Sequence, residues 1–138
     1  MSHWEHFHHQ ADIGVRGYAD TMASAFEQVA IALTAVITDP AAVEKRVSIQ
    51  FHCEAPDREL LLTDWLNALI YEMATRKMLF SRFAVSLNTG ELNATAWGEP
   101  IEVARHKPAV EIKGATYTEL QVTERPEGGW IAQCVVDV

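Results

Sequence analysis

Apolar residues occupy every second position from 47 to 53, and polar residues lie between them. This period of two predicts a half-buried β-strand over residues 46–53. Shorter apolar runs predict further strands, and the turn-forming sequence Asn88-Thr89-Gly90 predicts that two of them form a hairpin. The further strands are expected over residues 13–18, 79–87, 91–97, 110–113, 117–123 and 130–138.

Two segments have helical periodicity, over residues 21–38 and 57–77. Asp20 or Thr21 is expected to cap the first helix, and Asp57 marks the start of the second. Both helices are apolar over far more than one stripe, so each should be covered on more than one side. Two largely buried helices among about eight strands, with mostly hairpin connections, predict an α+β fold. We expect antiparallel or mixed sheets layered around the helices.

The length of 138 residues predicts a single domain over residues 1–138. Apolar residues make up 49% of the chain and charged residues 22%, which is typical of a folded globular protein. The net charge is −8, and the eleven Lys and Arg residues are scattered. Counterion release from phosphates requires clustered basic residues, so nucleic acid is not expected as a direct ligand. The acidity favours a metal ion or a basic protein partner instead.

Cys53 and Cys134 both lie in apolar strand patterns, which predicts two buried, reduced thiols. The polar, histidine-rich start of the chain does not have the pattern of a secretory signal. No apolar run approaches the roughly 20 residues that span a bilayer. We therefore expect a cytoplasmic protein without membrane contact.

Carboxylates are placed at both ends of the chain. Asp12 lies at the start of the first predicted strand, Asp137 is the penultimate residue, and Val138 carries the terminal carboxylate. If the first and last strands are neighbours, three hard oxygen groups converge. Such a donor set suits Ca²⁺, Mg²⁺ or Mn²⁺ better than Zn²⁺. Solvated strand-end aspartates are the alternative.

Other candidate groups give weaker signals. On a strand, His6 and His8 share a face and could bind Zn²⁺, but no third ligand has suitable spacing, so hydrogen-bonded or solvated histidines are expected. No nucleophile motif or phosphate-binding glycine loop occurs, so catalysis is not expected. Lys113 is either a solvated strand end or a cation that balances the acidic groups or contacts a partner.

Six short motifs occur in order along essentially the whole chain. They are His9-Gln10-Ala11-Asp12-Ile13-Gly14, Ala25-Phe26-Glu27, Leu61-Leu62-Thr63-Asp64-Trp65-Leu66-Asn67-Ala68-Leu69-Ile70-Tyr71, Gly98-Glu99 with Arg105-His106, Lys113-Gly114-Ala115-Thr116-Tyr117, and Asp137-Val138. Together these segments resemble the archease family, small proteins that assist RNA ligation.

The resemblance implies a protein that activates an RtcB-type RNA ligase. Such a cofactor promotes formation of the ligase–guanylate intermediate and multiple turnover, in tRNA splicing or RNA repair. The ligase would be the protein partner, and the chain itself would not be an enzyme. A divalent cation is implied, with Ca²⁺ preferred to Mg²⁺ or Mn²⁺.

The same resemblance assigns residues. The family's metal site falls on Asp12, Asp137 and Val138, and Lys113 matches a position tied to activation. His9 and His106 match recurrent polar positions, which we group with partner activation.

Two departures from the family pattern concern this site. The family commonly has Glu-His-Thr where this chain has His8-His9-Gln10, so a carboxylate and a hydroxyl are absent beside the metal ligands. Family members also often have an aromatic residue or histidine at the position of Thr118. We expect the loss of outer ligands to alter metal affinity.

Two other functions compete with ligase activation. A general chaperone or specificity modulator of RNA-modifying enzymes would act through exposed apolar surface. A small metal-dependent hydrolase would use the acidic residues directly.

Overall fold

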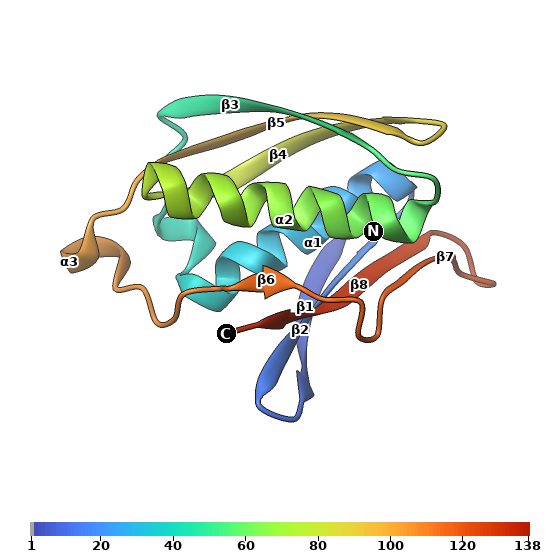
Figure 1. Ribbon diagram of the computed structural model, residues 1–138, viewed down its shortest axis with the longest axis horizontal. Helices are drawn as coiled ribbons and strands as arrows, with labels where there is room; N and C mark the ends of the chain where they lie inside the picture. The colour runs from blue at the N-terminus through green and yellow to red at the C-terminus, as the bar shows by residue number, and fades with distance from the viewer. Residues whose placement is uncertain (1) are drawn as a thin grey trace.

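The structure is a computed structural model that describes residues 2–138, and two antiparallel sheets enclose two long helices in it (Figure 1). The larger sheet has the order β1-β2-β8-β6, and β7 also pairs with β8. Its strands are β1 (His3–His9), β2 (Asp12–Ala19), β6 (Gly114–Ala115), β7 (Gln121–Glu124) and β8 (Trp130–Asp137). The smaller sheet has the order β3-β5-β4, with strands β3 (Val47–Glu54), β4 (Met78–Asn88) and β5 (Glu91–Pro100).

The helices are α1 (Met22–Ile37), α2 (Arg58–Arg76), the short α3 (Val103–His106) and the 3-10 turn η1 (Pro40–Ala42). α1 contacts β2 and β8 of the larger sheet and β4 of the smaller one, so it lies between the two layers (Figure 1). Within residues 2–138, no helix has the length and apolar character needed to cross a bilayer.

Side-chain caps fix where the two long helices begin. The Thr21 hydroxyl accepts a hydrogen bond from the Ser24 amide at 3.1 Å. The Asp57 carboxylate accepts one from the Leu60 amide at 2.8 Å. Each cap satisfies an amide that has no partner inside the helix.

An aromatic cluster joins α2 to the smaller sheet. Trp65 is fully buried, and its ring meets Phe51 and Phe83 edge-on. Its indole N–H donates to the Phe26 carbonyl at 3.2 Å, which ties α2 to α1. Burial of this large ring with its polar group satisfied stabilises the contact between the helices and the sheet.

The predicted α+β class and its layered arrangement are confirmed. Both predicted long helices are present within one residue at each end, and the hairpin around Asn88 is present, with β5 continuing to Pro100, three residues beyond its predicted end. Cys53 and Cys134 are free thiols, half-buried and buried respectively.

Some predicted boundaries were wrong. Residues 110–113 are irregular, and the strand begins only at Gly114. Residues 117–120 form a turn, so β7 starts at Gln121. β1 was not among the predicted strands.

Candidate functional site

A row of sequence-predicted site residues crosses one end of the larger sheet. His9 of β1 pairs with Asp12 of β2. The β2–β8 register pairs Ile13 with Val136, and its continuation sets Asp12 beside Asp137. On the far side of β8, Asp137 pairs with Gly114 of β6. Because directly opposed residues share a face of the sheet, His9, Asp12 and Asp137 lie on the same face. We refer to Asp12, Asp137 and the adjoining Val138 as the acidic row.

The segment before β6 brings Lys113 to the same end. The Lys113 amide donates to the Asp137 carbonyl at 2.8 Å, so its backbone lies directly against the last residue of β8. Lys113 itself is exposed.

Asn67 of α2 holds this segment in place. Its side-chain oxygen accepts from the Ala115 amide at 2.9 Å, and its NH₂ group donates to the Ala115 carbonyl at 3.4 Å. Thr116 adds a hydroxyl bond to the Val135 carbonyl at 2.8 Å. The position of Lys113 next to the acidic row therefore depends on α2 as well as on the sheet.

A two-residue turn, Gln10-Ala11, joins β1 to β2 and places His9 beside Asp12 of the acidic row. Gln10 has φ of 55°, the left-handed conformation that residues other than glycine rarely adopt.

The acidic row has no compensating cation among the described residues: no Lys or Arg side chain forms an ion pair with Asp12 or Asp137 there. Arg16 lies on the same face of β2, but it is bonded to Glu5 at 2.6 Å and to Gln133 at 2.7 Å. Asp12 is half-buried and Asp137 is exposed. Neighbouring carboxylates on one face repel each other. The donor chemistry of the row therefore fits a divalent cation with oxygen ligands.

His106 lies in a different place, in a buried cluster around Glu99. Its Nε2 is 2.9 Å from a Glu99 carboxylate oxygen, and its Nδ1 accepts from the Glu102 amide at 2.9 Å. An Nδ1 that accepts leaves the proton on Nε2, so the neutral ring donates to Glu99. The structure thus gives His106 a packing environment, and its grouping with partner activation stays a prediction.

Glu99 is fully buried and holds the cluster together. Arg105 donates two bonds of 2.8 Å to its two oxygens, and the Glu44 amide donates a third. The bonds from Arg105 are the largest cause that lowers the pKa of Glu99 to about 2. A buried carboxylate satisfied in this way stays ionised. The motif Gly98-Glu99…Arg105-His106 therefore anchors the α3 segment that leads toward Lys113.

Sequence reasoning missed two features. The role of Asn67 was not expected, although the residue lies inside a quoted motif. A group of His52, Glu54 and Glu91 on the smaller sheet was missed because it depends on a pairing register that no local pattern gives.

Comparison with known proteins places this small α+β protein in a defined class. Residues 4–138 match the model of the Archease protein family (MTH1598/TM1083). Proteins named archease are 39% identical in Pyrococcus furiosus, over all of both chains, and 36% identical in Methanosarcina mazei, over 98% of this chain and 95% of the relative.

Two solved structures share the fold. A solution structure from Methanobacterium thermoautotrophicum has a TM-score of 0.85, 30% identity and 98% coverage of each chain. A Thermotoga maritima crystal structure, described as an archease and possible chaperone, has a TM-score of 0.56 and 17% identity, and covers 96% of this chain and 94% of its own. The chain belongs to the archease family.

Proposed function

We propose that this chain is a metal-binding activator of an RtcB-type RNA ligase that promotes ligase guanylylation and multiple turnover in tRNA splicing or RNA repair. The single observation that carries the proposal is the acidic row: β2 and β8 pair so that Asp12 and Asp137 are neighbours on one face. Membership of the archease family supports a helper role for the chain.

The cation would lie between the carboxylates of Asp12 and Asp137 and main-chain oxygens of Val138. Only oxygen donors are involved, so Ca²⁺ is the ion we expect, with Mg²⁺ or Mn²⁺ as alternatives. When bound, the ion would neutralise the repulsion within the row and provide a positive centre at this end of the sheet.

Activation would work by unequal affinity for two ligase states. A helper shifts an equilibrium only if it binds one conformation more tightly than the other. The exposed Asp137 and Lys113 offer charges of both signs at one end of the sheet, where a ligase surface can contact both. Lys113 and His9 would make these partner contacts, and His106 would act through the packing of its segment.

This role requires neither RNA contact nor a catalytic group in the chain. The net charge of −8 disfavours direct binding to phosphates. We therefore propose that the ligase alone binds the RNA and performs the chemistry.

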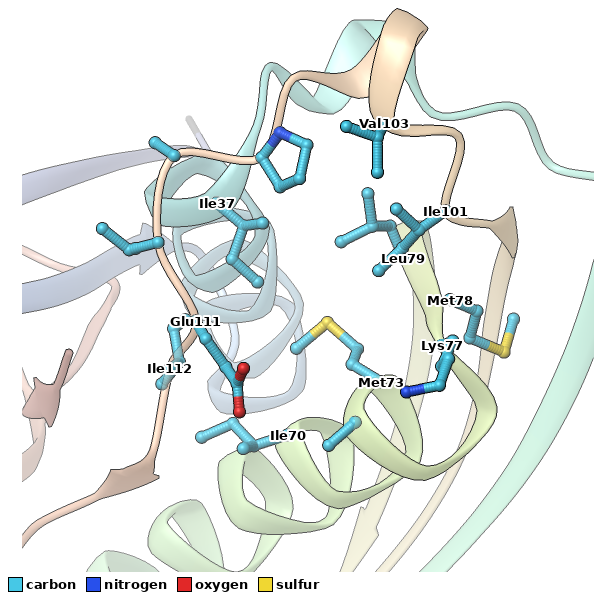
Figure 2. Close-up of a pocket in the computed structure, with 14 residues that line it drawn as sticks. Ile37, Ile70, Met73, Lys77, Met78, Leu79, Ile101, Val103, Glu111 and Ile112 are labelled. Atoms are coloured by element: carbon cyan, nitrogen blue, oxygen red, sulfur yellow. The ribbon is translucent and has the colours of Figure 1, made fainter.

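A general chaperone is the second candidate, and an apolar pocket favours it. The pocket has a volume of about 610 Å³ and lies between the C-terminal half of α2 and residues 101–112 (Figure 2). Ile70, Met73 and Leu79 line it, and Lys77 and Glu111 bring the charged groups (Figure 2). Apolar surface of this kind can hold exposed side chains of another protein. If this function dominates, Val103→Asp, at an exposed position that lines the pocket, will abolish suppression of aggregation of an unrelated protein, and Asp137→Ala will not.

Ligase guanylylation tests the main proposal. The rate of ligase–guanylate formation is measured with catalytic amounts of wild-type protein, Asp137→Ala and Glu124→Ala. Glu124 is exposed on β7, at the opposite end of the larger sheet, and its substitution changes the net charge equally. We expect Asp137→Ala to lose stimulation and Glu124→Ala to keep it. Full stimulation by Asp137→Ala would rule out the acidic row as the activating site.

A further inference from the structure

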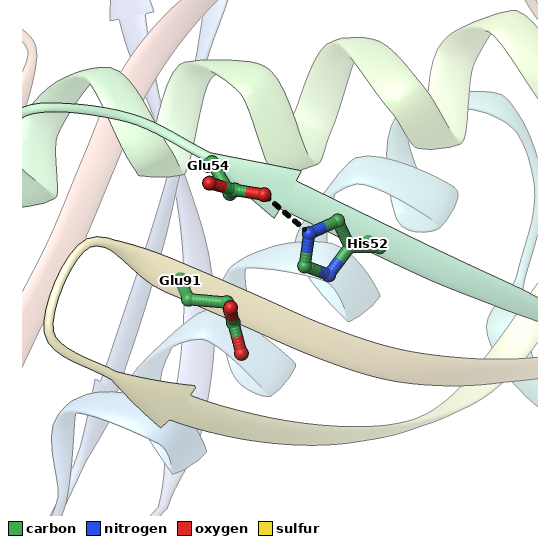
Figure 3. A group of neighbouring side chains, drawn as sticks. All are labelled: His52, Glu54 and Glu91. Atoms are coloured by element: carbon green, nitrogen blue, oxygen red, sulfur yellow. Dashed lines mark hydrogen bonds and ion pairs between the residues drawn. The ribbon is translucent and has the colours of Figure 1, made fainter.

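His52, Glu54 and Glu91 form a second group of metal-ligating side chains (Figure 3), on the smaller sheet, whereas the acidic row lies on the larger sheet. His52 and Glu54 lie two residues apart on β3, and Glu91 is the first residue of β5. One ligand atom of each residue lies within 4.8 Å of the other two.

The pairing register creates an electrostatic conflict at this point. Glu54 of β3 is directly opposite Glu91 of β5. Directly opposed like charges destabilise an antiparallel pair. Among residues 2–138, neither carboxylate forms an ion pair with Lys or Arg. The Nε2 atom of His52 lies 2.9 Å from a carboxylate oxygen of Glu54. A cation between the two carboxylates would remove the repulsion.

Asn93 orients the imidazole and one carboxylate. It is the cross-strand partner of His52, and its side-chain oxygen lies 2.8 Å from His52 Nδ1. Its NH₂ group donates to Glu91 Oε1 at 3.1 Å. An amide oxygen and a carboxylate oxygen only accept, so without a metal Nδ1 donates to Asn93 and Nε2 donates to Glu54. Nε2 is the atom that faces Glu54.

This is the arrangement that metal-binding histidines use. A ligating imidazole commonly donates its other N–H to an oxygen, which fixes the tautomer and the ring orientation. Without a metal, the hydrogen bond to Glu54 raises the pKa of His52, so a proton occupies Nε2 more readily than in a free histidine. A metal ion and a proton would therefore compete for the same atom.

We propose that His52, Glu54 and Glu91 form a surface site for a divalent transition-metal ion, with Zn²⁺ as the ion of the appropriate class. One imidazole nitrogen and two carboxylates suit Zn²⁺ better than the all-oxygen donors of the acidic row do. His52 and Glu54 are exposed, so water completes the coordination. Bonds to zinc are about 2.0–2.2 Å long. The glutamate side chains must therefore move inward from their present separation, which exposed side chains do at little cost.

Zinc titration of the full-length protein by calorimetry at pH 7.5 tests the site. We compare wild-type protein with His52→Ala, Glu91→Gln and Asn93→Ala, and use His8→Ala as the matched control, because His8 is an exposed histidine on the other sheet. Asp137→Asn is included to separate this site from the acidic row. Circular dichroism melts without metal check that every variant is folded.

We expect His52→Ala and Glu91→Gln to weaken Zn²⁺ binding at least about tenfold, and Asn93→Ala to weaken it by about tenfold through the lost orientation of the ring. His8→Ala and Asp137→Asn should bind as the wild type does. Binding should also weaken as the pH is lowered from 7.5 to 5.5, because His52 becomes protonated. Unchanged binding by His52→Ala, or loss of binding in His8→Ala, would overturn the proposal. Neither result depends on whether the chain activates a ligase.

Discussion

Asp12 and Asp137 are neighbours across the β2–β8 pair, although they lie near opposite ends of the chain. The relationship follows from the register that pairs Ile13 with Val136 and from the antiparallel direction of the two strands. It brings two carboxylates to one face at the end of the larger sheet, with His9 on one side and Gly114 on the other.

Removing one of these charges should stabilise the metal-free protein. Asp137→Asn eliminates a like-charge neighbour of Asp12, and we expect a gain of up to about 0.5 kcal/mol in the free energy of unfolding. Urea unfolding in the presence of a chelator measures the effect. If Asp137→Asn is clearly less stable than the wild type in the presence of the chelator, Asp137 has a favourable partner in the fold.

Glu99 should be a strong determinant of stability. Glu99→Gln keeps the size of this buried side chain but removes the charge that Arg105 and the Glu44 amide stabilise. We expect a loss of at least about 2 kcal/mol, since a buried network loses its central acceptor. Urea unfolding at pH 7 measures it, and Glu124→Gln, an exposed glutamate, is the control.

The same carboxylate gives a specific pH dependence. The pKa of Glu99 is about 2 in the folded protein and near its ordinary value of 4.5 in the unfolded chain. A depressed folded pKa adds stability above the unfolded pKa, and this contribution is lost as the pH falls from 4.5 toward 2. Glu99→Gln should therefore lose less stability than the wild type over this range. Parallel losses for the two proteins would contradict the assignment.

Asn67 should affect function more than stability. Asn67→Ala removes the two hydrogen bonds that join the Ala115 backbone to α2. Lys113 then loses its fixed position beside Asp137. We expect a loss of about 1 kcal/mol in stability and a larger fractional loss of ligase stimulation. Asn88→Ala, in the β4–β5 hairpin, serves as the control. Full stimulation by Asn67→Ala would show that the position of Lys113 is unimportant.

The two thiols should differ in reactivity. Burial raises the pKa of Cys134 to about 12 and also raises the pKa of the half-buried Cys53. Only the thiolate reacts, so both should be modified slowly by a disulfide reagent at pH 8, with Cys134 slower than Cys53. Mass spectrometry of partly modified protein identifies the order, and faster modification of Cys134 would contradict its burial.

Local sequence signals predicted the elements whose cause is local. Thr21 and Asp57 have the side chains that cap helices, and each does so in the structure. β1 was missed because its sequence lacks the apolar alternation of a half-buried strand. His6, whose Nε2 donates to the Ala32 carbonyl at 2.8 Å, occupies a position where such a strand usually has an apolar residue.

Local sequence patterns could not predict features that depend on contacts between residues far apart in the chain. Residues 110–113 look extended, but hydrogen bonds to α1 and β8 hold the segment at its two ends. The preceding Ala109 amide donates to the Ile37 carbonyl, and the Lys113 amide donates to the Asp137 carbonyl. His106 gave no sign of burial, because its partner Glu99 comes from the preceding strand. The positions of the carboxylates at the two ends of the chain indicated a cation site, the resemblance assigned the same residues, and strand pairing supplied their proximity.

The most direct test of the central claim is a calcium titration of the metal-free protein by calorimetry, with wild type, Asp12→Asn, Asp137→Asn and the control Glu124→Gln. We expect the wild type and Glu124→Gln to bind one Ca²⁺ per chain, and both aspartate variants to lose binding or to bind at least about tenfold more weakly. Equal calcium binding by Asp12→Asn, Asp137→Asn and the wild type would contradict the claim.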